Sequence, residues 1–129
     1  MLVKNERGDT LDTSAKKAAE LVLNGVDWEI AFFDFVDSYR KSDQKEAMIV
    51  ETPVSTGNDR LDSLLKSMVL YLCDETNIQP ISWAEEDGWL EHPWFVCGLS
   101  RLYSFSLVET PVRFKQNNIF VLSNFMDRV

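Results

Sequence analysis

The sequence predicts an all-α or mostly-α fold, a compact bundle of about five helices that leaves room for a small two-stranded ribbon. Two stretches, 28–40 and 59–76, place apolar residues at helical spacing, and each follows an acidic or amide residue that can cap a helix. All four prolines lie outside both stretches. A chain of 129 residues is most simply one domain, with 1–12 as a flexible arm.

The two N-terminal helices are expected to form a helical hairpin. The first should run to Asn24, with Thr13 or Ser14 as its cap and Gly25 as its stop. Because this helix is short and rich in alanine, it should pack closely against the second. The second helix, 28–40, places its large apolar side chains on one stripe: Trp28, Ala31, Phe32, Phe35, Val36 and Tyr39.

Residues 42–58 are the main interruption of the helical pattern. The short apolar run 47–50 fits either a helical turn or a short strand, and the proline and glycine that follow predict a loop. The third helix, 59–76, has Asn58 or Asp59 as its cap and is expected to be the central core helix. Its apolar residues keep the helical repeat over three turns: Leu61, Leu64, Leu65, Met68, Val69 and Leu72.

The C-terminal part shows weaker patterns. Ser82 can cap a short helix over 83–87. Pro93 is well placed as the first residue of a further helix, running through Phe95, Leu99, Leu102 and Tyr103. The β-prone run 119–122 would supply one strand of the ribbon. A final turn, 124–128, should dock on the core through its apolar residues, Phe125 and Met126.

Charge and cysteine usage limit the class of protein. Thirteen basic and 21 acidic residues give a net charge of −8, which repels phosphate backbones and attracts basic partners. Direct nucleic-acid binding by the whole surface is therefore disfavoured, although the charge is also explained by solubility alone. No apolar stretch approaches the roughly 20 residues of a membrane span. Cys73 and Cys97 lie in apolar contexts and are expected to be buried free thiols of a cytoplasmic protein.

The segment 67–100 is the best candidate for a partner-binding region. It holds six carboxylates, three of the four tryptophans and no lysine or arginine. Trp89 is the best candidate for an exposed anchor, whereas Trp94 is expected in the core. The predicted partner-binding residues here are Glu85, Glu86, Asp87, Trp89 and Glu91. The alternative is an ordinary core with a solvated acidic face.

The sequence carries no recognisable catalytic constellation. His92 is the only histidine, and a Cys97–His92 pair would lack the orienting group and oxyanion pocket that nucleophilic catalysis needs. No phosphate-binding, dinucleotide-binding or metal-ligand spacing is present. We therefore expect a non-enzyme without cofactor or metal. A small-molecule-binding protein or enzyme that uses the acidic segment and His92 is an alternative.

The C-terminal cations give a second candidate region. Residues 113–118 mix cations, an aromatic ring and amides, a composition that can contact phosphates or stack on bases. Arg113 and Lys115 are therefore predicted to bind a partner, and a nucleic-acid-binding regulator is the alternative function. These cations could equally balance the nearby acids.

A series of short motifs adds a family resemblance. In order, they are Glu51-Thr52-Pro53, the capped apolar helix from Asp59 to Leu72, Pro80-x-x-Trp83, Pro93-Trp94-Phe95, Thr110-Pro111-x-x-Phe114 and Asn118-Ile119-Phe120-Val121. This series resembles a widespread, poorly characterised bacterial family often encoded beside nucleotidyltransferase-like proteins of the AbiE toxin type. The resemblance spans about residues 12 to 129.

The resemblance implies an antitoxin that binds a cognate basic toxin, and it implies no catalytic residue. Family members tend to carry consecutive basic residues before the Asn-Ile-Phe run, but here Gln116 and Asn117 follow Lys115, which weakens a phosphate-binding role. Some members have an added helix-turn-helix domain. None is expected here, which argues against direct operator binding. Homo-oligomerisation is left open by the sequence.

Overall fold

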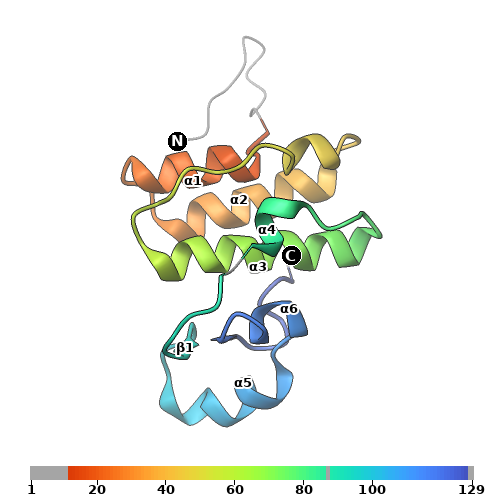
Figure 1. Cartoon of the computed structure of the whole chain (residues 1–129). Helices are drawn as coiled ribbons and strands as arrows, with labels where there is room; N and C mark the ends of the chain where they lie inside the picture. The colour runs from red at the N-terminus through yellow and green to blue at the C-terminus, as the bar shows by residue number, and fades with distance from the viewer. Residues whose placement is uncertain (1–11, 87, 128–129) are drawn as a thin grey trace. The chain divides into compact units, whose positions relative to one another are not determined.

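The computed structural model describes residues 12–86 and 88–127, which form two compact units, one ending at Asn58 and one beginning at Asp59 (Figure 1). Helices and short helical turns dominate both units, and the only sheet in the described residues has two short strands. This confirms the mostly-α fold class. The predicted arm lies outside the described residues except for its last residue, Asp12. The prediction of a single domain stays a prediction.

The first unit begins with the predicted helical hairpin, in which α1 (Ala15–Leu23) packs against α2 (Trp28–Lys41) (Figure 1). The Ser14 hydroxyl caps α1 by accepting a hydrogen bond of 3.1 Å from the Lys17 N–H. Gly25 lies at φ +101°, a left-handed conformation that ends the helix, as predicted. The apolar stripe of α2 is buried except for Trp28, which is half-buried and meets the edge of another ring.

A short 3-10 helix, η1 (Glu46–Met48), follows α2. The helical-turn alternative for 47–50 is therefore the one that the structure adopts. The rest of this unit is a loop, and an ion pair of 3.2 Å joins Lys16 of α1 to Glu51 within it.

The second unit is built on the predicted core helix, α3 (Asp59–Thr76), which ends where Asn77 adopts φ +57°. Two short helices, α4 (Ser82–Glu85) and α6 (Val112–Lys115), pack against it. Ser82 is the first residue of α4 and not its cap. Ile81 takes the cap position, because its backbone is extended and its carbonyl accepts the Ala84 N–H at 3.1 Å.

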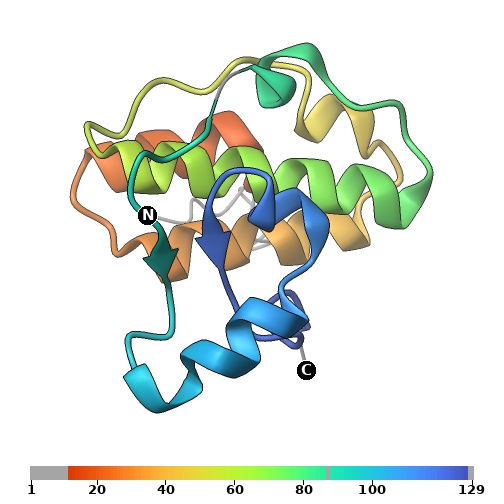
Figure 2. The same ribbon diagram turned by 60° about the horizontal axis from the view of Figure 1, so that its bottom comes forward.

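The predicted helix starting at Pro93 is wrong. Its first residues form strand β1 (Trp94–Phe95), which pairs in parallel with β2 (Ile119–Phe120) (Figure 2). The N–H groups of Trp94 and Val96 donate to the carbonyls of Asn118 and Phe120, both at 3.1 Å, so they are not available to a helix.

A left-handed Gly98 (φ +70°) then turns the chain into η2 (Ser100–Leu102) and α5 (Tyr103–Glu109). The helix on this stretch therefore begins at Tyr103, the last residue of the predicted span. The ring of Phe95 stacks on Tyr103 at 4.1 Å and on Phe120 at 5.0 Å between centroids, which joins the strand pair to α5.

The C-terminal tail docks as predicted. Phe125 meets the ring of Phe114 edge-on at 5.7 Å between centroids, and Met126 is buried. The tail forms turns, with the Phe125 N–H donating to the Leu122 carbonyl at 3.0 Å. The Ser123 N–H donates to the Glu109 carboxylate at 3.2 Å. The last residue of the predicted final turn, Arg128, lies outside the described residues.

Candidate functional site

The tethered segment, residues 88–96, crosses the second unit mostly as irregular chain, and buried polar side chains hold it. The Ser63 hydroxyl of α3 donates to the Gly88 carbonyl. One turn later, the Ser67 hydroxyl donates to the Ser63 carbonyl at 3.1 Å and accepts from the Asn117 amide at 2.9 Å. Ser63, Ser67 and Asn117 are all buried. The start of the segment is therefore fixed to α3 through a connected polar network.

Both backbone polar groups of Leu90, its N–H and its carbonyl, form hydrogen bonds. Its N–H donates to the Asn117 carbonyl at 3.0 Å, and its carbonyl accepts from the Asn118 side-chain amide at 2.9 Å. Asn118 reaches this position with φ +66°, a left-handed conformation that asparagine tolerates better than most residues. From Trp94 onward the β1–β2 pairing takes over. Hydrogen bonds therefore hold the segment at its start, middle and end.

Gly88 lies close to side chains of α3. A Cβ atom at this position would lie 3.3 Å from the Ser63 hydroxyl oxygen and 3.3 Å from Cδ of Lys66. Both distances are shorter than ordinary van der Waals contact, so a larger residue would require these side chains to shift by a few tenths of an ångström.

The tethered segment exposes an aromatic anchor. Trp89 is 59% exposed, and Glu91, His92 and Pro93 are exposed after it. By contrast, Trp83 in α4 is buried. Trp94, which the sequence placed in the core, is half-buried, and the Arg60 guanidinium lies 5.6 Å from the centroid of its ring.

The predicted acidic residues that the structure describes are at the surface. Glu85 and Glu86 are exposed at the end of α4, and Glu91 is exposed on the tethered segment. Asp87 lies outside the described residues. Because four residues span at most about 14 Å, Glu85 and Trp89 belong to one neighbourhood.

The two predicted cations have different surroundings. Arg113 holds Asp74 in a two-point ion pair, with Nε and Nη2 at 2.7 Å and 3.0 Å from the two carboxylate oxygens. These hydrogen bonds, with a further contribution from the charge of Glu85, raise the pKa of Arg113. Lys115 is exposed. The pairing of Arg113 supports the alternative in which C-terminal cations balance nearby acids.

The aromatic ring of this C-terminal region is not available for base stacking. Phe114 is fully buried and packs against Tyr71 at 6.0 Å between centroids. A nucleic-acid-binding function could not use this ring to stack on bases, because stacking requires an accessible aromatic face.

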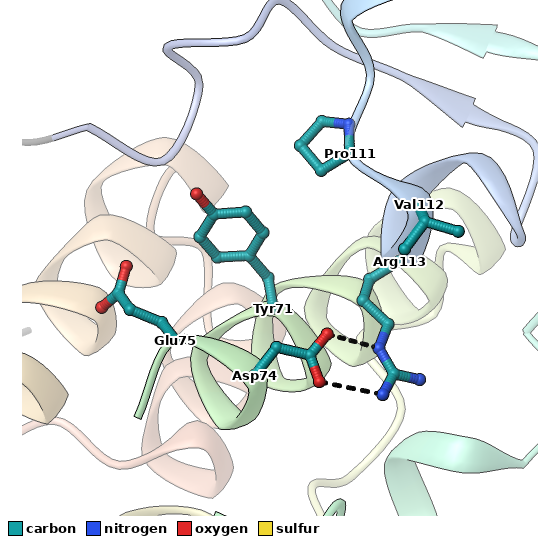
Figure 3. A pocket seen from close by; sticks show the side chains of 6 residues that line it. All are labelled: Tyr71, Asp74, Glu75, Pro111, Val112 and Arg113. Carbon is teal, nitrogen blue, oxygen red and sulfur yellow. Dashed lines mark hydrogen bonds and ion pairs between the residues drawn. The ribbon is translucent and has the colours of Figure 1, made fainter. Parts of the chain in front are cut away.

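A hollow that the sequence did not predict lies beside the Arg113–Asp74 pair (Figure 3). Its volume is about 360 Å³, and its lining comes from α3 and from the start of α6: Tyr71, Asp74, Glu75, Pro111, Val112 and Arg113. The spacing of Tyr71, Asp74 and Glu75 places them on one face of a helix, a signal that was readable in the sequence. Their meeting with 111–113 depends on tertiary packing and was not readable.

The two cysteines are free thiols in different environments. Cys73 is fully buried in α3, and burial is the main cause that raises its pKa. Cys97 is half-buried, so the prediction of burial holds fully for Cys73 only. His92 and Cys97 are not joined by any hydrogen bond that the structure shows for them; the Cys97 thiol lies near the Leu99 carbonyl and the Ser106 hydroxyl.

Within residues 12–86 and 88–127, no group of three or more His, Cys, Asp or Glu side chains is arranged to hold a metal ion. Over the same residues, no helix combines the length and the apolar character that a membrane crossing requires. Comparison with protein-family models, with curated proteins and with solved structures finds no match.

Proposed function

We propose that this chain is an interaction protein, an antitoxin-like one that binds and neutralises a nucleotidyltransferase-type toxin. The observation that carries the proposal is Trp89, an indole more than half exposed on a segment fixed by hydrogen bonds at Gly88 and Leu90. Tryptophan is the residue type most enriched in binding hot spots. A fixed anchor also loses less conformational entropy on binding than a mobile one.

The charge around this anchor supports a basic partner. Glu85, Glu86 and Glu91 are exposed near Trp89, and the whole chain carries a net charge of −8. An enzyme that acts on nucleotides or RNA needs a basic pocket, which an acidic partner can cover. The identification of that partner as a nucleotidyltransferase-type toxin rests on the motif resemblance.

Exposed apolar side chains around α5 agree with an interaction protein. Phe105, Leu107 and Val108 are exposed on this helix, and Leu99 is exposed just before it. Apolar side chains gathered on one exposed element are more typical of a contact surface than of a surface that faces only water.

The proposal is tested by capture of the partner. The tagged full chain is purified from its native cells at low and at high salt, and the co-eluting proteins are identified by mass spectrometry. We expect one stoichiometric nucleotidyltransferase-like protein whose association slows as salt rises, because salt screens exposed charges. A chain that elutes without a protein partner, or with nucleic acid, would contradict the proposal.

A charge-reversal pair locates the acidic surface. Glu85→Lys with Glu86→Lys should slow association with the captured partner by about tenfold or more. Asp43→Lys with Glu46→Lys is the matched control, because it changes two exposed acids of the first unit by the same total charge. Equal slowing by both pairs would show that only net charge matters.

A further inference from the structure

Helix α5 has one packed side and one exposed side. Its packed side carries Tyr103, whose ring stacks on Phe95, and the fully buried Ser106. Its exposed side carries Phe105 and Val108, which are 57% and 81% exposed. These two residues are three positions apart, so their side chains are neighbours on the helix surface. The outer face of α5 is therefore an apolar surface that the described residues leave uncovered.

The charges on this face are arranged in a self-complementary way. Because η2 leads directly into α5, residues 100–109 form one helical run (Figure 2). Arg101 lies four residues before Phe105, and Glu109 lies four residues after it, so one side of the run carries a cation, an aromatic ring and an anion in that order. Both charged residues are exposed. Within the described residues, no ion pair engages the Arg101 side chain.

This order of charges selects a second copy of the chain. When two such runs pack antiparallel about a two-fold axis at Phe105, Arg101 of each copy faces Glu109 of the other. A parallel arrangement would instead place like charges opposite each other. The face does not favour a basic partner, because one cation and one anion leave residues 100–109 without net charge.

The size of the face sets the strength of the contact. Four apolar side chains here are about half exposed or more: Leu99, Phe105, Leu107 and Val108. Together they offer roughly 400–500 Å², about half of the 800 Å² that each partner in a stable interface buries. The net charge of −8 on each copy also opposes association. We therefore expect a weak, reversible contact that forms at high concentrations of the chain.

We propose that the outer face of α5 is a self-association surface on which a second copy of this chain docks antiparallel. The Phe105 rings meet at the centre with Val108 beside them, and two Arg101–Glu109 ion pairs form at the ends. The Ser123 N–H, at 3.2 Å, already holds the Glu109 carboxylate, so this anion is positioned before association. This dimer goes beyond the proposed function and does not depend on it, because it uses no residue of the acidic surface.

Sedimentation equilibrium of the full chain, from about 10 μM to about 1 mM, tests the surface. We expect the mean mass to rise toward twice that of one chain. Val108→Asp should weaken the dimer at least about tenfold, because it buries a charge in an apolar contact. Val50→Asp, at a 56% exposed valine of the first unit, is the matched control and should change nothing. A chain that stays monomeric, or equal weakening by both variants, would overturn the proposal.

Charge reversal tests the antiparallel arrangement. Arg101→Glu alone and Glu109→Arg alone should each weaken the dimer about tenfold, because like charges then face each other at both ends. An equimolar mixture of the two variants should recover the affinity of the parent chain, because every charge then faces an opposite one. Such a recovery also shows that both variants are folded. A mixture that associates no better than either variant alone would overturn the proposal.

The captured partner separates this surface from the acidic one. If Val108→Asp abolishes partner binding while the parent chain alone is monomeric, the α5 face belongs to the partner interface and self-association is wrong. If the chain dimerises as described but no protein partner is captured, the dimer stands and the proposed function fails.

Discussion

Helix α3 and the tethered segment lie in the same unit but are held by different forces. The helix buries apolar side chains at helical spacing, and its backbone is satisfied within the helix. The tethered segment instead depends on side chains remote in sequence, since Ser63 lies 25 residues before Gly88 and the Ser67–Asn117 bond joins residues 50 apart. The helix is the support, and the segment is the displayed part that carries Trp89.

This difference explains why the segment can expose a large apolar ring without being loose. Hydrogen bonds from buried Ser63 and half-buried Asn118 fix the backbone, while the side chains of Trp89 and Glu91 stay exposed. Within the described residues, no buried side-chain nitrogen or oxygen lacks a partner, so the polar network is complete. A complete network specifies one arrangement of the chain.

Breaking the packing of α3 should have the largest effect. Leu72 is fully buried, so Leu72→Ala leaves a cavity and should lower the free energy of unfolding by about 2–5 kcal/mol. Leu107→Ala, at a leucine that is 49% exposed, is the control and should change it by less than about 0.5 kcal/mol. Chemical denaturation measures both. Equal losses would show that the burial pattern does not describe the fold in solution.

Removing a buried hydroxyl should have the next largest effect. The single O–H of Thr110 lies within reach of both the Ser106 and the Val121 carbonyls, and its oxygen accepts the Val121 N–H; both contacts with Val121 are 3.0 Å long. Thr110→Val keeps the shape but leaves the Val121 N–H and carbonyl without the hydroxyl, which should cost about 1–3 kcal/mol of unfolding free energy. Thr110→Ser keeps the hydroxyl and should lose clearly less. A valine variant as stable as the parent would show that the hydrogen bonds of this hydroxyl do not stabilise this part of the unit.

A change at Asn118 should act on the tethered segment alone. Asn118→Gly tolerates the left-handed backbone but loses the bond to the Leu90 carbonyl, which should cost about 1 kcal/mol. Hydrogen exchange of the Leu90 N–H should accelerate. Asn77→Gly is the control, because Asn77 is also left-handed but ends α3. If both variants change Leu90 exchange equally, the tether is not the Asn118 amide.

The smallest expected effect compares two thiols, one in α3 and one just after the tethered segment. Cys97, half-buried just after the tethered segment, should react with a disulfide reagent at least about tenfold faster than Cys73 in α3. Burial raises the pKa of Cys73 above its ordinary value of 9.0. The stability from its neutral thiol is thus fully present below 9.0 and is lost as pH rises through the raised pKa.

Mass spectrometry of the labelled chain identifies the faster thiol. Cys73→Ala should abolish the part of the alkaline loss of stability that comes from this thiol, whereas Cys97→Ala should leave it in place. Faster labelling of Cys73 would contradict the burial of α3.

The parts that were predicted from sequence are those whose signals are local. Ser14 and Gly25 mark the ends of α1, and the periodicity of 59–76 marks α3, because caps and helical spacing involve residues within a few positions of each other. The docking of the tail was also predictable from local sequence, because an apolar side chain such as Met126 is more stable when it is buried.

The parts that were missed depend on distant partners. Pro93 suits the start of a helix, but strand β2 lies 25 residues after β1, so the pairing that overrides this preference has no local signal. The same holds for the ion pair of Arg113 with Asp74, which joins a predicted partner-binding cation to a residue 39 positions earlier in the chain. The exposure of Trp89 was anticipated from its acidic neighbours, whereas the network that holds it was not.

The most direct test of the central claim measures the affinity of the captured partner for two variants, Trp89→Ala and Ile30→Ala. Ile30, at 58% exposed, is the matched control in α2. A hot spot of about 2 kcal/mol predicts binding about thirtyfold weaker for Trp89→Ala and unchanged for Ile30→Ala. Partner binding by a folded Trp89→Ala variant that is as tight as that of the parent would contradict the claim that the tethered segment displays the anchor.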